Sequence, residues 1–268
     1  MTPNSPSTLQ LVCTDFDGTI HLEGTHPPVG TEFQELIAKL QSEGVRWVIN
    51  TGRDLSSLME EMARSRLSVK PDYVVVVERE IYRHDGACYL SHHAWNDRCT
   101  RIHEQLFARL RHELPPLFSW INENFGASVF EDAWSPFCLV ASNLDESMAI
   151  VRRFEEWAKA WPEVTVVRND VYARLSHVEY NKGTALREVA RLCGSDADRT
   201  FVAGDHVNDL PMLRPDLARW LMAPGNCVEE VRAAVEHAGG WVAPHKASEA
   251  VAEGLRRCLL RGALVDKQ

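Results

Sequence analysis

The chain has 268 residues, enough for two domains or for one large domain with an insertion. Hydrophobic residues make up 45% and charged residues 25%, which excludes wholesale disorder, a collagen-like repeat and a charged low-complexity chain. The 38 acidic residues outnumber the 29 basic residues, for a net charge of −9, so we expect no nucleic-acid partner. An acidic protein that handles an anion needs a local positive group, either a metal ion or a well-placed lysine.

Neither a membrane segment nor a secretion signal is expected. No run approaches the roughly 20 apolar residues that span a bilayer. The first eight residues lack the basic and apolar regions of a signal peptide and are expected to form a frayed tail. The seven cysteines include no Cys-x-x-Cys pair, which argues against zinc and disulfides and favours a reducing cytoplasm. No obligate protein partner is indicated.

Strand-like and helix-like segments alternate in the first part of the chain. A short apolar run ends abruptly at the polar residue Asp15, and apolar residues then recur at helical spacing up to a stop signal at Gly44. Alternation of this kind predicts a parallel sheet with helices on both faces. The expected order is strand 9–14, helix 31–42, strand 45–50, helix 55–67 and strand 73–77.

The alternation resumes in the last third of the chain and completes the predicted sheet. The expected order there is helix 184–192, strand 200–203, strand 220–223, strand 240–243 and helix 248–260.

The intervening segment is richer in tryptophan and carries its own strand and helix patterns. We therefore predict the α/β class, with a Rossmann-like doubly wound parallel sheet core of residues 1–79 and 179–268 and an inserted α/β cap domain of residues 80–178. Within the insertion, the expected elements are strands 137–141, 164–167 and 171–175 and a helix over 145–161.

Polar residues gather at four strand or helix ends of the predicted sheet. In an open parallel sheet, the loops at the carboxyl ends of the strands form the ligand crevice. Taken singly, each group is typical of a turn, a cap or a solvated surface, but their joint placement favours a site. The groups are Asp15, Asp17 and Thr19; Thr51, Gly52 and Arg53; Lys182, Gly183 and Thr184; and Gly204–Asp209.

Four of these residues are aspartates, which repel one another unless a cation binds among them. Carboxylate oxygens are hard ligands and indicate Mg²⁺ rather than Zn²⁺. One residue separates Asp15 from Asp17, so the two side chains share a face in an extended chain, whereas a bulge or turn aims them apart and lets a backbone carbonyl reach the metal. The predicted metal residues are Asp15, Asp17, Asp205 and Asp209.

Four motifs resemble, in order and context, those of the haloacid dehalogenase superfamily of phosphohydrolases. The insertion between the second and third motifs is similar to that of the Cof-like subgroup, which carries a large α/β cap, and residues 222–231 resemble that subgroup's segment after the fourth motif. The motifs are Asp15-Phe-Asp-Gly-Thr19, Asn50-Thr-Gly-Arg53, Lys182-Gly-Thr-Ala-Leu186 and Gly204-Asp-His-Val-Asn-Asp-Leu-Pro-Met-Leu213.

The resemblance implies a role for each motif residue. Asp15 is implied to be the nucleophile that forms an aspartyl-phosphate, and Asp17 the general acid and base. Thr51 and the Gly52 amide are implied to hold phosphoryl oxygens, and Lys182 to neutralise developing charge. Asn208 is implied to fix the nucleophile or the phosphate. Mg²⁺ is implied to be held by the Asp15 carboxylate, the Asp17 carbonyl and Asp205, with Asp209 behind them.

The chain departs from the subgroup's pattern at two places. Glu78-Arg-Glu80 stands where the subgroup commonly has an Asn-Gly-Ala-like segment. Arg174 and His177 stand near the place of an acidic residue and a proline before the motif lysine. We consider Arg174 and His177 candidates for substrate specificity, and the alternative is that both lie on a surface-exposed cap strand.

The leading functional hypothesis is a Mg²⁺-dependent phosphomonoester hydrolase that acts on a small phosphorylated metabolite, plausibly a sugar phosphate. A phosphotransferase or phosphomutase of the same superfamily is the nearest alternative, because both use the pair Asp15 and Asp17. A protein that binds a phosphorylated ligand without turnover is the alternative from a different class. The intact motifs argue against it, since a pure binder has no need for both aspartates.

Overall fold

The computed structural model describes residues 9–265, with side chains up to residue 260. The predicted N-terminal tail lies outside the described residues. The chain divides into two compact units. One, here called the sheet unit, comprises the segment up to His92 and the segment from Lys182 onward; the other, the inserted unit, comprises His93–Asn181.

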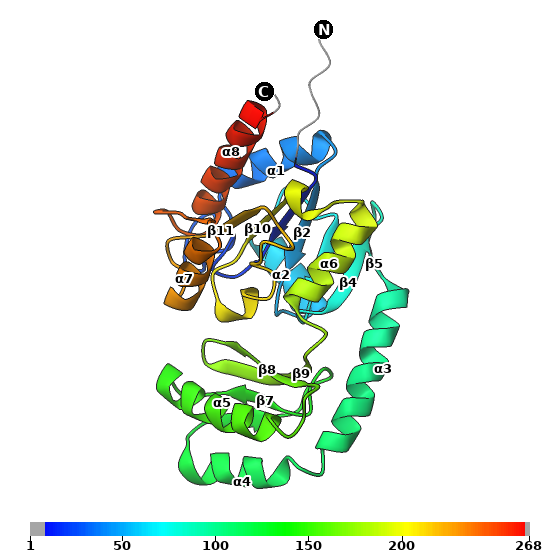
Figure 1. Cartoon of the computed structure of the whole chain (residues 1–268), viewed down its shortest axis with the longest axis vertical. Coiled ribbons are helices and arrows are strands. Elements are labelled where there is room, and N and C mark those ends of the chain that lie inside the picture. The colour runs from blue at the N-terminus through cyan, green and yellow to red at the C-terminus, as the bar shows by residue number, and fades with distance from the viewer. Residues whose placement is uncertain (1–8, 266–268) are drawn as a thin grey trace. The chain divides into compact units, whose positions relative to one another are not determined.

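An eight-stranded sheet forms the centre of the sheet unit (Figure 1). In spatial order its strands are β12 (Trp241–Val242), β11 (Trp220–Ala223), β10 (Thr200–Ala203), β1 (Leu11–Thr14), β2 (Arg46–Asn50), β3 (Tyr73–Val76), β4 (Glu80–His84) and β5 (Tyr89–Ser91). The strands from β12 to β3 are parallel. Their apolar runs lack alternation, as is typical of strands that are covered on both faces.

Helices cover both faces of this sheet. The ring of Trp47 on β2 lies edge-on to Phe33 of α1 (Thr31–Ser42), whereas Asn50, three residues further on, donates to the Lys182 carbonyl of α6 (Lys182–Cys193). Residues an odd number apart on a strand point to opposite faces, so α1 and α6 cover different faces. The predicted α/β class with a doubly wound core is confirmed. The unit's other α-helices are α2 (Leu55–Arg64), α7 (Glu229–His237) and α8 (Ala247–Val265).

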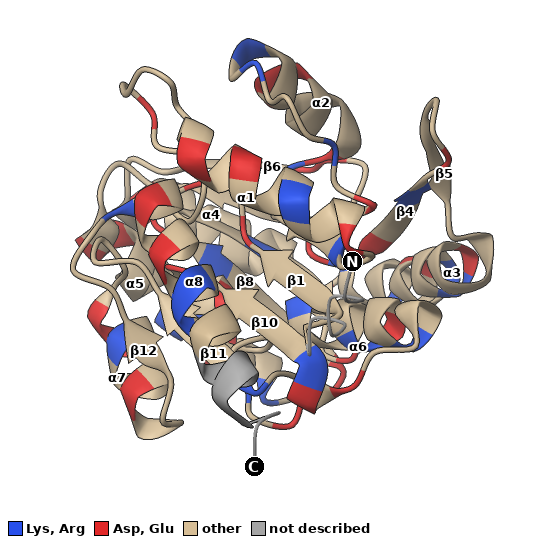
Figure 2. Cartoon of the chain, turned by 90° about the horizontal axis from the view of Figure 1, so that it is seen from above, with Lys and Arg blue, Asp and Glu red and all other residues tan. Residues whose placement is uncertain are grey.

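Flanking helices such as α1 and α2 carry both acidic and basic residues (Figure 2). Several of them pair along one helix, as Arg64 does with Glu60 and Lys39 with Glu43. The exposed faces of these helices therefore carry charge of both signs. Within residues 9–265, no helix has both the length and the apolar character needed to cross a bilayer.

The predicted boundary at residue 80 is wrong, because the chain makes a hairpin back into the sheet before it leaves the unit. β4 pairs antiparallel with β3, and β5 pairs antiparallel with β4. The turn between β3 and β4 uses left-handed backbone at Val77 (φ 44°) and Glu78 (φ 65°), and Ile81 of β4 is fully buried. The sheet is therefore mixed at this edge, and the inserted unit begins at residue 93 and ends at 181 rather than at 178.

The inserted unit is built on a four-stranded antiparallel sheet packed against helices. Its core joins Leu139 and Leu175 on the strands to Ile121 and Phe154 on the helices. The predicted strands and the helix that follows residue 143 are present, and two helices and one strand were not predicted from the sequence. The elements are α3 (His93–Leu110), α4 (Pro115–Asn124), α5 (Leu144–Ala158) and, in spatial order, β6 (Ser128–Phe130), β7 (Cys138–Val140), β9 (Tyr172–His177) and β8 (Val164–Asn169).

Candidate active site

The carboxyl ends of β1, β10 and β2 meet at one edge of the sheet, and three of the four motifs follow them directly. Thr14 of β1 stands opposite Ala203 of β10 and Ile49 of β2. The amide of Asp15 donates to the carbonyl oxygen of Ala203 at 3.0 Å, so the pairing continues one residue beyond β1. The polar residues of these motifs therefore begin at the same level of the sheet.

Lys182 connects the third motif to the first and the fourth. Its Nζ donates to Oδ1 of Asp15 at 2.7 Å and to Oδ1 of Asp209 at 2.6 Å. The side chain is only 1% exposed. Its carbonyl oxygen accepts a hydrogen bond of 2.9 Å from Nδ2 of Asn50, which fixes the start of α6 against the end of β2. A lysine is tolerated at such depth because two carboxylates both neutralise it and accept its hydrogen bonds.

The carboxylates around Lys182 exceed the positive charge that it supplies. One carboxylate oxygen from each of Asp15, Asp205 and Asp209 lies within 4.8 Å of the others. Burial raises the pKa of Asp15 well above its ordinary value, and the neighbouring carboxylates raise it further, whereas Lys182 opposes the shift. Burial and the charge of Asp209 raise the pKa of Asp205 to about 7. Part of each shift comes from repulsion between the carboxylates, which a bound cation would relieve.

A divalent cation with a preference for hard ligands fits this cluster, since every candidate ligand atom is a carboxylate oxygen. Asp209 already uses both of its oxygens: Oδ1 accepts from Lys182, and Oδ2 accepts from the amides of Asp205 and His206 at 2.8 and 3.0 Å. Asp15 and Asp205 are therefore better placed than Asp209 to offer an oxygen to a cation.

Glycines allow the loops of the first and fourth motifs to approach closely. Gly18 has a left-handed φ of +77°, and a β-carbon there would collide with the carboxylate of Asp205. At Gly204, a β-carbon would lie 2.6 Å from the β-carbon of Asp209. Oγ1 of Thr19 donates to Oδ1 of Asp205 at 2.8 Å. Larger residues at these two glycines would displace the aspartates of the cluster.

The side chain of Asp17 has different partners from that of Asp15, which binds Lys182, and this favours the arrangement in which a turn aims the two carboxylates apart. Its Oδ2 and Oδ1 accept hydrogen bonds from Nε and Nη2 of Arg53 at 2.6 and 2.7 Å. Burial raises the pKa of Asp17, but the hydrogen bonds and positive charge of His21 and Arg53 outweigh it and lower the pKa to about 2. Asp17 is therefore ionised at neutral pH in this arrangement.

His21 and Glu61 complete a network around Asp17 that the sequence did not predict. Nδ1 of His21 lies 3.5 Å from Oδ1 of Asp17, and Nε2 lies 3.2 Å from Oε1 of Glu61. Glu61 also lies 4.0 Å from Nη1 of Arg53. The His21 ring stacks on Phe16 with centroids 5.0 Å apart. Arg53 belongs to a motif, but no spacing in the sequence connects His21 or Glu61 to Asp17.

Asn208 of the fourth motif contacts a carboxylate for which the sequence indicates no role. Its Nδ2 donates to Oε1 of Glu78 at 2.9 Å. Glu78 is only 6% exposed, and its Oε1 lies 3.4 Å from the position that a β-carbon on Gly52 would take. Thr51, beside Gly52, is 1% exposed. The departure from the Asn-Gly-Ala pattern was the only sequence signal that pointed to Glu78.

The two candidate specificity residues lie on β9 of the inserted unit and point to opposite faces of its sheet. His177 packs inside the unit, with its ring centroid 6.0 Å from that of His103 and 5.7 Å from that of Tyr180. Burial lowers its pKa. Arg174 is 2% exposed and His177 8%, so the alternative of a surface-exposed strand is wrong for both.

Arg174 lies on the face of this sheet that is opposite to the core residues Ala173 and Leu175. It stands across from Cys138 of β7. In the sheet register, Phe130 and Val140 belong to the same face and are 44% and 42% exposed. Arg174 thus shares a face with exposed apolar side chains, whereas His177 shares one with the unit's core.

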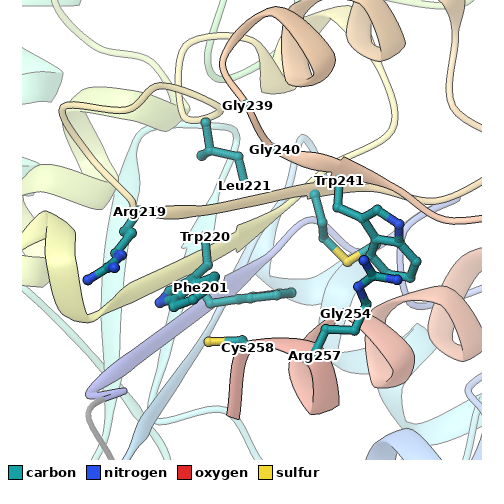
Figure 3. A pocket seen from close by; sticks show the side chains of 11 residues that line it. Phe201, Arg219, Trp220, Leu221, Gly239, Gly240, Trp241, Gly254, Arg257 and Cys258 are labelled. Carbon is teal, nitrogen blue, oxygen red and sulfur yellow. The ribbon is translucent and has the colours of Figure 1, made fainter. Parts of the chain in front are cut away.

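A cavity of about 580 Å³ lies beside β11, β12 and α8, and its lining includes none of the predicted site residues (Figure 3). Its two arginines lie over indole rings: Arg257 is 4.3 Å from the ring centroid of Trp241, and Arg219 is 5.2 Å from that of Trp220. These cation–π contacts already engage both guanidinium groups. The candidate active site is therefore the carboxylate cluster at the carboxyl ends of the strands.

The sequence model of the haloacid dehalogenase-like hydrolases matches residues 12–114 and 130–255, which include all four motifs. The chain belongs to this family. Membership confirms the resemblance to the haloacid dehalogenase superfamily that the motifs indicated. It also confirms the predicted enzyme class, a haloacid dehalogenase-type phosphatase. Among curated relatives, YxeH of Bacillus subtilis, named as a candidate phosphatase, is 22% identical over 249 residues, covering 83% of this chain and 89% of that protein.

Solved structures of the superfamily share the fold. The sucrose-phosphatase of Synechocystis sp. PCC6803, in complex with sucrose and phosphate, is 18% identical with a TM-score of 0.68 and covers 93% of this chain and 97% of that one. BT1666 of Bacteroides thetaiotaomicron, a phosphatase of the haloalkanoate superfamily, is 18% identical with a TM-score of 0.64 and covers 96% and 98%. The family's hydrolase fold therefore extends over nearly the whole chain.

Proposed function

We propose that this haloacid dehalogenase-like hydrolase is a Mg²⁺-dependent phosphomonoesterase that hydrolyses a small sugar phosphate through an aspartyl-phosphate. The observation that carries the proposal is the buried cluster in which Lys182 contacts Asp15 and Asp209 while Asp205 lies within reach. A cluster short of positive charge suits a phosphoryl group only once a divalent cation joins it. The fold shared with a sucrose-phosphatase supports a sugar phosphate as substrate.

In the first step, an Asp15 oxygen attacks phosphorus in line with the leaving oxygen, so that one P–O bond forms as another breaks. Thr51 and the Gly52 amide hold phosphoryl oxygens, and Lys182 offsets the charge that develops on them. The Asp15 and Asp205 carboxylates and the Asp17 carbonyl would hold Mg²⁺, with Asp209 behind them, and the ion would supply additional positive charge. Water then cleaves the aspartyl-phosphate and regenerates the Asp15 carboxylate.

Asp17 gives a proton to the leaving oxygen in the first step and takes one from water in the second. The contacts with His21 and Arg53 keep Asp17 ionised, with a pKa of about 2, which suits the base role but not the acid role. We therefore propose that Asp17 releases Arg53 when substrate binds and turns to the leaving oxygen. Loss of the arginine contact raises the pKa of Asp17, so that its carboxylate takes up a proton from solvent and then gives this proton to the leaving oxygen.

A phosphate-release screen across phosphorylated metabolites tests the proposed function. With Mg²⁺ present, we expect sugar phosphates to be hydrolysed at higher kcat/KM than nucleotides or phosphopeptides. Release of free phosphate separates hydrolysis from intramolecular transfer, since a mutase returns an isomeric phosphate ester and no free phosphate. Absence of phosphate release from every phosphomonoester tested contradicts the proposal.

Asp17→Asn should slow the first step most with poor leaving groups. A sugar alkoxide needs a proton as it departs, whereas an activated aryl oxide does not. We expect the first step to fall by about 10²-fold or more for a sugar phosphate and by much less for an aryl phosphate. Rapid-quench assays should show a burst of aryl alcohol followed by slow turnover, because the second step lacks its base. Equal first-step losses on both substrates would remove the acid role.

Arg174→Ala should weaken selection of the native substrate. We propose that Arg174 binds polar or anionic parts of the substrate away from the reacting phosphate, so kcat/KM should fall about ten-fold, which corresponds to about 1.4 kcal/mol. A small aryl phosphate should be affected much less. His177→Ala serves as the comparison, because His177 packs within the inserted unit and its loss should lower thermal stability instead. Equal losses for Arg174→Ala on both substrates contradict a selective role.

We propose the cytoplasm as the location of this enzyme, since all seven cysteines are present as thiols, and that suits a reducing compartment. Assay and storage under reducing conditions should therefore preserve activity.

A further inference from the structure

The carboxylate of Glu78 lies among the groups that are proposed to bind the phosphoryl oxygens. Its Oε1 accepts from Nδ2 of Asn208 at 2.9 Å and lies beside Gly52, 3.4 Å from where a β-carbon would stand. Its negative charge is also close enough to raise the pKa of Lys182, together with Asp15 and Asp209. Three of the proposed phosphate-binding groups, Asn208, Gly52 and Lys182, therefore lie near the carboxylate of Glu78.

The orientation of Asn208 fits this arrangement. Its Oδ1 is buried without a hydrogen-bond partner in the described part of the chain, while its Nδ2 is directed at Glu78. A phosphoryl oxygen accepts hydrogen bonds just as a carboxylate oxygen does, so both compete for the amide of Asn208. The Glu78 carboxylate would also repel a phosphoryl oxygen bound at Asn208, and water screens this repulsion little because Glu78 is only 6% exposed.

The backbone that carries Glu78 is held in a conformation that residues other than glycine rarely adopt. Val77 and Glu78 have φ values of 44° and 65°, and the left-handed region is especially unfavourable for a β-branched residue such as Val77. The Val77 amide donates to the Arg53 carbonyl at 2.8 Å, and the Glu78 amide donates to the Thr51 carbonyl at 2.9 Å. These bonds to the second motif hold the turn and direct Glu78 towards the site.

We propose that Glu78 is an internal competitor for the phosphoryl site: its carboxylate takes the place of a phosphoryl oxygen at Asn208 in the free enzyme and withdraws when a phosphorylated substrate binds. This inference rests on the proposed function. Inorganic phosphate, which makes no contacts beyond the phosphoryl site, displaces Glu78 poorly. A sugar phosphate displaces it because the sugar contributes additional binding free energy. Glu78 therefore reduces inhibition by the product phosphate and favours substrates with a large leaving group.

Glu78→Gln and Glu78→Gly both remove the charge of Glu78, and they differ in whether the rest of the side chain remains. Glutamine retains the size of the side chain and can still accept from Asn208, but it carries no charge. Glycine removes the side chain and is compatible with the left-handed backbone, so this variant should fold at least as stably as the wild type. Calorimetric titration with inorganic phosphate, in the presence of Mg²⁺, should show at least about ten-fold tighter binding for both variants, and product inhibition should strengthen in parallel.

Glu80→Gln is the matched control, because it removes the same charge two residues further on, where Glu80 accepts from the Tyr82 hydroxyl. It should bind phosphate as the wild type does. Unchanged or weaker phosphate binding in both Glu78 variants, with the wild type still hydrolysing phosphomonoesters, overturns the competitor role alone. If the wild type neither binds phosphate nor releases it from any phosphomonoester, the proposed function fails and the competitor role fails with it.

Discussion

Asp15→Asn should lower turnover by at least about 10³-fold, because an amide oxygen is a far weaker nucleophile than a carboxylate and no aspartyl-phosphate can form. Phosphate release under saturating substrate measures the loss. Intact-mass spectrometry of acid-quenched enzyme should show a phosphorylated species in the wild type and none in the variant. The position of Asp15 directly after the buried strand β1, in contact with Lys182, motivates this expectation.

The same substitution should leave the fold intact. Asparagine is nearly isosteric with aspartate, and Lys182 keeps its hydrogen bond to Asp209 at 2.6 Å. Loss of one carboxylate from a crowded cluster removes repulsion, so the melting temperature should stay equal or rise. Asp216→Asn, which changes an exposed aspartate paired with Arg214, is the matched control and should retain full activity. Near-normal turnover of purified Asp15→Asn would refute the nucleophile assignment.

Removal of divalent cations should abolish activity, and Mg²⁺ should restore it. Asp15, Asp205 and Asp209 bring their oxygens within 4.8 Å of one another, and Lys182 contributes a single positive charge to them, so the site needs a further positive charge before a phosphoryl group can bind. Assay after exhaustive chelation, followed by titration with Mg²⁺, measures the dependence. Ca²⁺ should support turnover poorly, because its looser and higher coordination lets both oxygens of the nucleophile bind the metal.

A second readout is independent of turnover. Binding of Mg²⁺ to the native state alone should raise the free energy of unfolding by about 2.7 kcal/mol at a concentration 100 times Kd. Asp205→Asn should reduce this stabilisation, since Asp205 offers one of the candidate ligand oxygens. Full activity after chelation contradicts the metal requirement. A Mg²⁺-dependent shift in melting temperature that is the same in Asp205→Asn and wild type contradicts the ligand assignment.

Local patterns in the sequence determined the class of fold and the positions of most core elements. The apolar run before Asp15, the helical spacing after Thr31 and the apolar run 73–77 each formed the predicted element, because a strand or a helix buried on a known face needs only its own periodicity to be specified. The motifs followed the strand ends, and a parallel sheet places all those ends at one edge. The carboxylate cluster could therefore be predicted from the sequence alone.

Tertiary structure decided what depends on contacts between distant segments. The hairpin of β4 and β5 joined the sheet because Val77 and Glu78 adopt left-handed backbone, which the side chains do not favour and which only surrounding hydrogen bonds maintain. The network around Asp17 was also set by three-dimensional proximity, since Arg53 binds Asp17 from a distant segment and Glu61 of α2 contacts both Arg53 and His21.

The same distinction applies to the residues without a sequence motif. Glu78 lies beside Asn208 because the turn after β3 and the loop after β10 meet in the folded chain. Arg174 and His177 lie in different environments because they point to opposite faces of β9. Periodicity specifies which residues are buried within an element. Which buried charges then face one another depends on the packing of elements, and packing is a property of the folded chain as a whole.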